Sequence, residues 1–271
     1  MTRIAVIGGG RIGEALISGL LGAGRPAKDL VVAEKFEERA RELTERFGIR
    51  VTSTADAAEG ADIIVVAVKP GDLPAILDDL APVVEESDLD QLLVSMAAGV
   101  PTTLFEARLP AGTPIVRVMP NTPMLVGQGA SAVTAGRHAT AEHLAAVEAM
   151  LSPVGLVVKV GEAQLDAVTA VSGSGPAYFF LVVEAMVDAG VALGLPRTVA
   201  TELTVQTIVG SAAMLAESDE SATELRAAVT SPGGTTAAAV GQLERGGVRA
   251  ALLDALTAAR DRSVQLGAGS Q

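Results

Sequence analysis

The sequence predicts an α/β protein, with a doubly wound parallel sheet in its amino-terminal part and an all-helical carboxyl-terminal part. Short apolar runs alternate with helical patterns as far as Val160, which is typical of parallel sheets covered by helices. Strand patterns then disappear, and alanine-rich helical patterns continue to the end of the chain. We therefore expect two domains, over residues 1–161 and 162–271.

Eight apolar runs predict strands, and five segments between them predict helices. The run 62–68 is almost entirely apolar, as expected of a central parallel strand buried on both faces. Gly48 is expected to end the second helix. The expected strands cover 3–7, 30–33, 50–52, 62–68, 92–95, 114–118, 131–134 and 155–160, and the expected helices cover 11–24, 37–47, 73–80, 101–109 and 141–151.

The carboxyl-terminal helical pattern is interrupted at three segments rich in glycine and proline, 172–176, 194–196 and 231–234. The apolar stretch 178–195 contains Glu184 and Asp188, which favours a buried soluble helix over a membrane span. A domain this small does not easily cover so much apolar helix surface, so we expect a homodimer formed through the helical domain.

Composition narrows the possible partners and chemistries. The formal net charge is −12, which disfavours nucleic acid and an anionic membrane surface as partners. The chain has no cysteine, which excludes disulfides and thiol catalysis and suits a reducing cytoplasm. His138 and His143 lie in a polar stretch, so we expect no bound metal. The first residues do not resemble a signal peptide, and we expect a cytoplasmic protein.

A glycine motif, Gly8-Gly9-Gly10-Arg11-Ile12-Gly13, follows the first expected strand, which ends at Ile7, and begins the first expected helix. In this context the spacing G-x-G-x-x-G predicts a Rossmann-type dinucleotide-binding domain rather than an ordinary glycine-rich turn. Gly8 would permit the tight turn, Gly10 the close approach of a pyrophosphate, and Gly13 the close packing of helix on strand. Free amides at the helix start would hold the phosphates.

Further candidate cofactor residues follow the other expected strands. Glu34 and Lys35 follow the second expected strand, at the position that contacts the adenosine ribose. A carboxylate there favours the free 2′-hydroxyl of NADH, whereas a cation favours the 2′-phosphate of NADPH, so these two residues leave the choice of cofactor open. Lys69 could act electrostatically at the cofactor, or it could be an ordinary surface lysine. Asn121 could face the nicotinamide or the substrate. The alternative for Asn121 is a purely structural turn. The candidates after the fourth, fifth and sixth strands are Ala67, Val68, Lys69, Pro70, Met96, Ala97, Ala98 and Asn121.

Two glycine loops with hydroxyls precede helices in the second domain. Each would present helix-start amides and hydroxyl donors to an anion such as a carboxylate, although ordinary helix capping is the alternative. No His, Cys or close carboxylate cluster suggests covalent catalysis, and hydride transfer from a dinucleotide needs none. The candidate substrate residues are Ser174, Ser231, Gly233, Gly234, Thr235 and Thr236.

Four motifs occurring in order resemble those of pyrroline-5-carboxylate reductases, over nearly the whole chain from Ile4 to about Leu266. They are Ala67–Pro70, Met119–Pro123, Ser172–Tyr178 and Ser231–Thr236. The chain is similar to bacterial members of actinobacterial type. The resemblance implies reduction of 1-pyrroline-5-carboxylate to L-proline, the last step of proline synthesis, with NADPH or NADH as hydride donor. It also implies a dimer of interleaved helical domains, with five dimers often forming a decamer.

The resemblance also implies roles for individual segments. Residues 7–12, 67–70 and 96–98 would touch the cofactor, the 231–236 loop would hold the substrate carboxylate, and the hydroxyl of Thr236, the expected catalytic residue, would bond the ring nitrogen. Two positions depart from the family pattern: Ala55 stands where some members have an Asn near the adenine, and Glu34-Lys35 differs from the Ser- or Arg-bearing corners of NADP-preferring relatives.

Three alternatives remain beside this hypothesis. A reductase of a related cyclic imine would share every feature. A hydroxyacid-type dehydrogenase would need a Lys or His as general acid, and the chain contains neither after Ala163. A non-catalytic dinucleotide sensor would need no second anion-binding loop.

Overall fold

The computed structural model describes residues 2–268. By its internal contacts the chain forms two compact units, one containing residues 2–176 together with 258–268 and the other containing 177–257. The expected boundary at 161 lies within the first unit. The division into a dinucleotide-binding domain over 1–161 and a helical domain over 162–271 stays a prediction.

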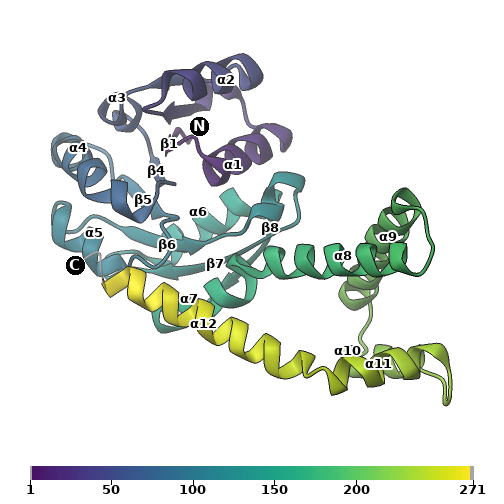
Figure 1. Ribbon diagram of the computed structural model, residues 1–271. Coiled ribbons are helices and arrows are strands. Elements are labelled where there is room, and N and C mark those ends of the chain that lie inside the picture. The colour runs from purple at the N-terminus through teal and green to yellow at the C-terminus, as the bar shows by residue number, and fades with distance from the viewer. Residues whose placement is uncertain (1, 269–271) are drawn as a thin grey trace. The chain divides into compact units, whose positions relative to one another are not determined.

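One eight-stranded sheet forms the centre of the first unit (Figure 1), in the order β3-β2-β1-β4-β5-β6-β7-β8. The first six strands in this order, all parallel, have the Rossmann arrangement, in which the chain reverses direction across the sheet between β1 and β4. The strands are β1 (Ile4–Ile7), β2 (Leu30–Ala33), β3 (Arg50–Thr52), β4 (Ile63–Val66), β5 (Leu92–Ser95), β6 (Ile115–Met119), β7 (Gly129–Ala135) and β8 (Gly155–Lys159). All eight expected strands are therefore confirmed, within three residues at each end.

The expected doubly wound parallel sheet is confirmed, with one addition: β7 runs antiparallel to β6. Only a short 3₁₀ corner, Thr122–Val126, connects these two strands. A parallel pair needs a crossover of a dozen or more residues, usually a helix, so this connection permits only an antiparallel return. β8 then pairs parallel to β7 after a helical crossover.

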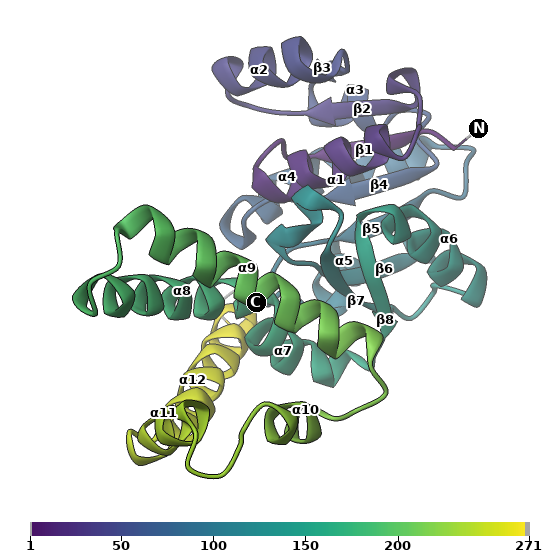
Figure 2. The ribbon, with the colours of Figure 1, turned by 90° about the vertical axis from the view of Figure 1, so that its right-hand side faces the viewer.

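Helices cover both faces of this sheet (Figures 1 and 2). Alternate strand residues enter two separate cores, one with α1, α2 and α6 and the other with α3, α4 and α5. Within β1, Ile4 and Val6 belong to the first core, while Ala5 and Ile7 belong to the second. The helices are α1 (Arg11–Gly22), α2 (Glu37–Phe47), α3 (Thr54–Ala58), α4 (Leu73–Glu86), α5 (Thr102–Arg108) and α6 (Ala141–Leu151).

Five of these six helices were expected from the sequence. Gly48 ends α2 in the left-handed conformation, with φ +65°, as predicted. α4 is longer than expected because Pro82 is accommodated within the helix. α3 was not expected, since its five residues form little more than one turn and show no apolar periodicity.

The second unit is helical and exposes large apolar side chains in the single chain. α8 (Gly175–Ala192) and α12 (Val248–Ala268) cross between the two units, and α9 (Arg197–Glu217), α10 (Ala222–Ala228) and α11 (Thr235–Arg245) lie within the second. Phe180 is 68% exposed, and Phe179 and Leu181 are nearly as exposed. The sequence-based expectation that α8 is buried therefore does not hold within one chain. Breaks at 194–196 and 231–234 are confirmed, and further breaks follow α9 and α11.

Two helical segments, Glu162–Ala192 and Arg197–Glu217, have the length and apolar character that a membrane-crossing helix would need. Few residues of the most apolar part of either segment are buried within the chain. Length and composition alone do not distinguish such a span from a helix covered by another protein chain.

The end of α12 packs against the sheet within the first unit (Figure 1). The buried Ser263 hydroxyl donates to Asp166 Oδ1 at 2.6 Å. Gly99, in the turn after β5, has φ +76°, and a Cβ there would lie 2.9 Å from the carbonyl oxygen of Ser263. A Cβ on Gly267 would overlap the carbonyl oxygen of Gly99. The turn after β5 and the end of α12 therefore meet through two glycines.

A buried ion pair also joins the sheet to the segment that begins the carboxyl-terminal helices. Arg117 of β6 is 4% exposed, and its guanidinium lies 2.7 Å from Oε1 of Glu162. The same Oε1 accepts the amide of Thr102 at 3.3 Å. The other buried guanidinium nitrogen and Glu162 Oε2 have no hydrogen-bond partner. The sequence did not predict this pair.

Candidate functional site

Four predicted cofactor segments meet at one edge of the sheet. Ile7 is level with Ala33 of β2 and with Val66 of β4. The segments that begin at Gly8, Glu34, Ala67 and Met96 therefore follow the carboxyl ends of four adjacent strands. Backbone bonds fix this edge: Gly8 N donates to Ala33 O at 2.9 Å, Ala67 N to Ile7 O at 2.8 Å, and Met96 N to Val66 O at 2.9 Å. In doubly wound sheets this edge binds the ligand.

The glycine motif has the geometry predicted for it. Gly8 has φ +105°, and a Cβ there would lie 2.7 Å from the carbonyl oxygen of Ala67. A Cβ on Gly13 would overlap the carbonyl oxygen of Gly8, whereas the space around Gly10 is open to 4 Å. Gly10 precedes α1 and makes no side-chain capping bond. The chain therefore presents helix-start amides beneath open space, which fits a dinucleotide pyrophosphate.

A carboxylate and a guanidinium hold this loop from the side of β2. Glu34 Oε2 accepts the amide of Gly9 at 3.0 Å, and Arg39 Nε donates to the Gly9 carbonyl at 2.8 Å. Arg39 also pairs with Glu42 and Glu14, both of which raise the pKa of Arg39. The loop role of Arg39 was not predicted, because no sequence motif marks it.

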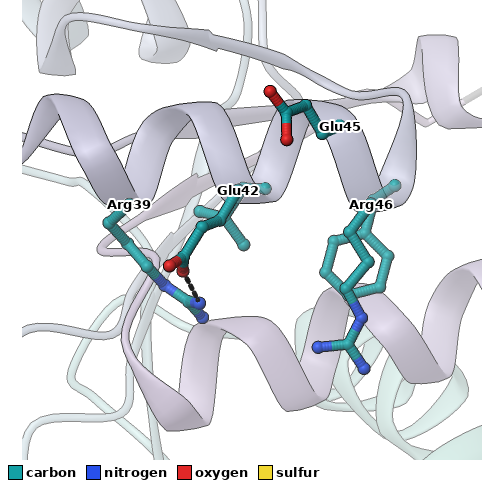
Figure 3. A pocket seen from close by; sticks show the side chains of 6 residues that line it. Arg39, Glu42, Glu45 and Arg46 are labelled. Carbon is teal, nitrogen blue, oxygen red and sulfur yellow. Dashed lines mark hydrogen bonds and ion pairs between the residues drawn. The ribbon is translucent and has the colours of Figure 1, made fainter.

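A shallow pocket lies along the same helix, α2 (Figure 3). Arg39 and Glu42 are hydrogen-bonded beside it, and Arg46 lies further along the helix and pairs with Glu14. Its lining residues all belong to α2. It borders the glycine loop through Arg39, which lines the pocket and also donates to the Gly9 carbonyl.

The other strand-end candidates differ in exposure. Met96 and Ala97 are buried, while Ala67, Val68, Pro70 and Ala98 are half-buried. Lys69 is exposed and begins the 3₁₀ turn Pro70–Asp72. Backbone groups and small side chains, rather than charges, thus dominate this part of the edge.

Asn121 has a structural role, which was one of the two alternatives that its sequence position left open. Its side chain is buried, its Nδ2 donates to Ser172 O at 3.1 Å, and its Oδ1 accepts the amide of Ala130 at 2.8 Å. Pro176, four residues after Ser172, has no amide hydrogen to give to that carbonyl, and Asn121 supplies the missing donor. Contact between Asn121 and a cofactor stays a prediction. The side-chain amide of Asn121 has a second hydrogen that could make this contact.

The segment before Pro176 is helical, whereas a glycine loop was expected. Thr169–Gly173 forms a π-helix, and the amide of Ser174 donates to Thr169 O at 2.8 Å. Gly173 fits here because a Cβ would overlap the Met119 methyl group. Glycine, serine and proline together indicate a loop, but here they form a wide turn of helix, of a kind that often occurs at functional sites. Pro176 lies in the first turn of α8, where proline is well tolerated.

Asn121→Ala is expected to loosen this wide turn. The change leaves the Ser172 carbonyl and the Ala130 amide without their partners, each worth about 1–3 kcal/mol when buried. We expect the thermal midpoint to fall and amide exchange at residues 130 and 172–174 to accelerate. Thr44→Ala, which removes one exposed hydroxyl on α2, is the control. Unchanged exchange in the Asn121 variant would contradict the assigned role.

The second predicted anion loop lies in the second unit. Gly233 has φ +69°, and the amide of Gly234 donates to Ser231 O at 3.0 Å. Gly234 precedes α11 and makes no side-chain capping bond. Thr235 is exposed and Thr236 is half-buried in the first turn. The loop thus has helix-start amides and three hydroxyls, as expected for a carboxylate site.

No cluster of three or more His, Cys, Asp or Glu that could hold a metal occurs among residues 2–268. His143 instead caps α6, where its ring Nδ1 accepts the amide of Thr140 at 3.0 Å.

Comparison with known proteins identifies the family. Residues 162–266 match the family described as "Pyrroline-5-carboxylate reductase dimerisation", and residues 3–99 match "NADP oxidoreductase coenzyme F420-dependent". The chain is 54% identical to pyrroline-5-carboxylate reductase of Mycobacterium tuberculosis, with 98% of this chain and 97% of that protein covered. The chain belongs to the pyrroline-5-carboxylate reductase family. A reductase of this family from Pseudomonas aeruginosa is 44% identical over 97% of the chain and 96% of the relative.

Solved structures of pyrroline-5-carboxylate reductases have the same fold over the full chain. The Coxiella burnetii reductase has a TM-score of 0.90 at 37% identity, and each chain is covered to 98%. A Plasmodium falciparum pyrroline carboxylate reductase with NADP bound has a TM-score of 0.89 at 30% identity, with the same coverage. The predicted Rossmann-type fold, family and nicotinamide cofactor are thus confirmed. As a pyrroline-5-carboxylate reductase with the family's dimerisation domain, the chain is an oxidoreductase that forms a homo-oligomer.

Proposed function

We propose that this chain reduces 1-pyrroline-5-carboxylate to L-proline, the last step of proline synthesis, with a nicotinamide dinucleotide as hydride donor. The identity of 54% over 98% of the chain to a reductase of that name supports the choice of substrate. The strand-end edge and the open space over Gly10 support the cofactor. When bound, the nicotinamide supplies the hydride for the imine carbon.

The chain's own residues would bind and orient the two reactants. The first-turn amides of α1 hold the pyrophosphate, and the segments at Glu34, Ala67 and Met96 line the dinucleotide. The 231–236 loop holds the substrate carboxylate through amides at Gly233–Thr235 and the hydroxyl of Ser231. Orientation of this kind contributes much of the rate, about 7–11 kcal/mol in well-aligned reactions. Ser174 is a further substrate contact in this proposal.

The Thr236 hydroxyl would position the ring nitrogen and relay to it a proton taken up from solvent as the imine carbon receives the hydride. We expect Thr236→Ala to lower kcat by about 10²–10⁴-fold, the usual contribution of a positioned proton donor, with less than a threefold change in dinucleotide affinity. Steady-state kinetics and fluorescence titration of the reduced dinucleotide measure the two effects. Thr44→Ala is the matched control. An unchanged kcat would remove Thr236 from the mechanism.

The function itself is tested by following reduced dinucleotide oxidation at 340 nm with 1-pyrroline-5-carboxylate. A parallel reaction with the six-membered cyclic imine carboxylate tests a related substrate. Formation of proline, identified by mass spectrometry, supports the proposal. Dinucleotide binding without turnover of either imine would contradict it.

We further propose that the oligomer is built from dimers joined through the helical unit, and that five dimers form a decamer. The exposed apolar side chains of α8 and α9, including Phe179, Phe180 and Leu203, support such an interface. Mass photometry at nanomolar concentration distinguishes a monomer, a dimer and a decamer. The absence of cysteine supports a cytoplasmic location, which fractionation of cells would test.

A further inference from the structure

The carboxylate at the end of β2 has a fixed position over the glycine loop. Glu34 Oε2 accepts the amide of Gly9, and Oε1 accepts the amide of Phe36, both at 3.0 Å. Both donors are neutral backbone groups, so they orient the carboxylate without cancelling its charge. Glu34 follows the strand end that reads the adenosine ribose in Rossmann-type domains.

The neighbouring cations are held by other carboxylates. Lys35 Nζ lies 2.8 Å from Asp72 Oδ1. Arg39 uses Nε on the Gly9 carbonyl and its two terminal nitrogens on Glu42 and Glu14, at 2.8 and 2.5 Å. In this structure both cations are therefore paired with carboxylates other than Glu34.

Two further cations, Arg11 and Arg41, belong to the flanking helices α1 and α2. Arg11 is exposed at the start of α1, where the pyrophosphate common to both dinucleotides is expected. Arg41 is exposed on α2, two residues beyond Arg39 in the sequence. The corner thus presents the Glu34 carboxylate, which accepts two backbone amides and has no ion-pair partner among the described residues.

NADPH differs from NADH by a phosphate on the ribose 2′-oxygen. A carboxylate at this position accepts a hydrogen bond from the free 2′-hydroxyl and repels a 2′-phosphate. We propose that this chain binds NADH in preference to NADPH, and that Glu34 sets the preference. The proposal deepens the proposed function and rests on it only for the class of cofactor. It differs from what the NADP-bound Plasmodium falciparum structure suggests for that 30% identical relative.

The test is equilibrium titration of the purified oligomer with NADH and with NADPH, followed by the fluorescence of the reduced nicotinamide and without imine substrate. For the unmodified chain we expect NADH to bind at least about tenfold more tightly, since like charges placed together cost several kcal/mol. The ratio of the two dissociation constants should shrink between low and high salt, because salt screens repulsion at an exposed site.

Glu34→Gln keeps the side-chain shape and removes the charge. We expect it to tighten NADPH binding at least about fivefold and to change NADH binding by less than about threefold. Glu37→Gln, an exposed acid in the first turn of α2, makes the same change in net charge and should leave the ratio unaltered. Asp72→Asn frees Lys35 and should also favour NADPH, by a smaller factor.

Equal or tighter binding of NADPH by the unmodified chain would overturn the proposal, even if the Glu34 variant failed to fold. An unchanged ratio in a folded Glu34→Gln protein, or an equal shift in Glu37→Gln, would overturn the role of Glu34. Tight NADH binding without reduction of the imine would defeat the proposed function and leave this proposal standing.

Discussion

Gly13→Ala is expected to destabilise the first unit strongly and to abolish dinucleotide binding. The added Cβ would overlap the carbonyl oxygen of Gly8, so α1 must move away from β1. Overpacking of this kind costs about 3 kcal/mol or more where backbone obstructs the new atom, which lowers the thermal midpoint by roughly 6–12 °C in a domain of this size. Differential scanning calorimetry and fluorescence titration of reduced dinucleotide measure the two effects.

Two other glycines of the same region separate folding from binding. Gly22, at the end of α1, has open space around it, so Gly22→Ala should preserve or slightly raise stability. Gly10 is equally open within the chain, so Gly10→Ala should leave the thermal midpoint unchanged while it weakens dinucleotide binding. A Gly13 variant as stable as the Gly22 variant would contradict the packing account, and undiminished binding by Gly10→Ala would show that no pyrophosphate approaches there.

Glu162→Ala is expected to cost about 3 kcal/mol of stability, the lower end of the range of 3–5 kcal/mol for breaking a buried pair. The cost arises at Arg117, which is 4% exposed and would lose the carboxylate that pairs with it. The lower end applies because the Glu162 side chain is 36% exposed. Thermal unfolding at a fixed protein concentration measures the loss, since the oligomer makes the midpoint depend on concentration.

Glu148→Ala is the control for this experiment. It breaks the exposed pair of Glu148 with Lys159, which is 2.8 Å long and should contribute less than about 1 kcal/mol. Arg117→Met, which removes the buried charge itself, should cost less than Glu162→Ala does. Equal thermal midpoints for the Glu148 and Glu162 variants would mean that water hydrates the Arg117 guanidinium once its carboxylate partner is removed.

The central strands could be predicted from the sequence because β1, β2, β4, β5 and β6 are short, largely apolar runs buried on both faces. The glycine motif could be predicted because its glycines stand where the backbone leaves no room for a Cβ. Gly13 lies against the Gly8 carbonyl, and Gly8 lies against Ala67. The direction of β7 was missed although the chain carries the signal, since the connection from Met119 to Gly129 is too short for a helical crossover.

Other features depend on contacts distant in sequence and have no local pattern. Asn121 reaches a carbonyl 51 residues away, and Arg117 pairs with a residue 45 positions later. The π-helix was predicted as a loop because its glycines and serines favour loops, whereas Met119 packing at Gly173 and the hydrogen bond from Asn121 hold it helical. The exposure of α8 reflects a surface that a partner chain covers in the proposed dimer.

The return of α12 to the first unit means that the helical unit is an insertion, entered through α8 and left through α12. A shortened chain ending near residue 176 would lack the carboxyl-terminal residues that cover Gly99 and bond Asp166. The dinucleotide-binding half would thus lose the brace beside its own Met96–Ala98 turn. Recombinant versions of that half would need the last helix supplied as a separate peptide or joined through a short linker.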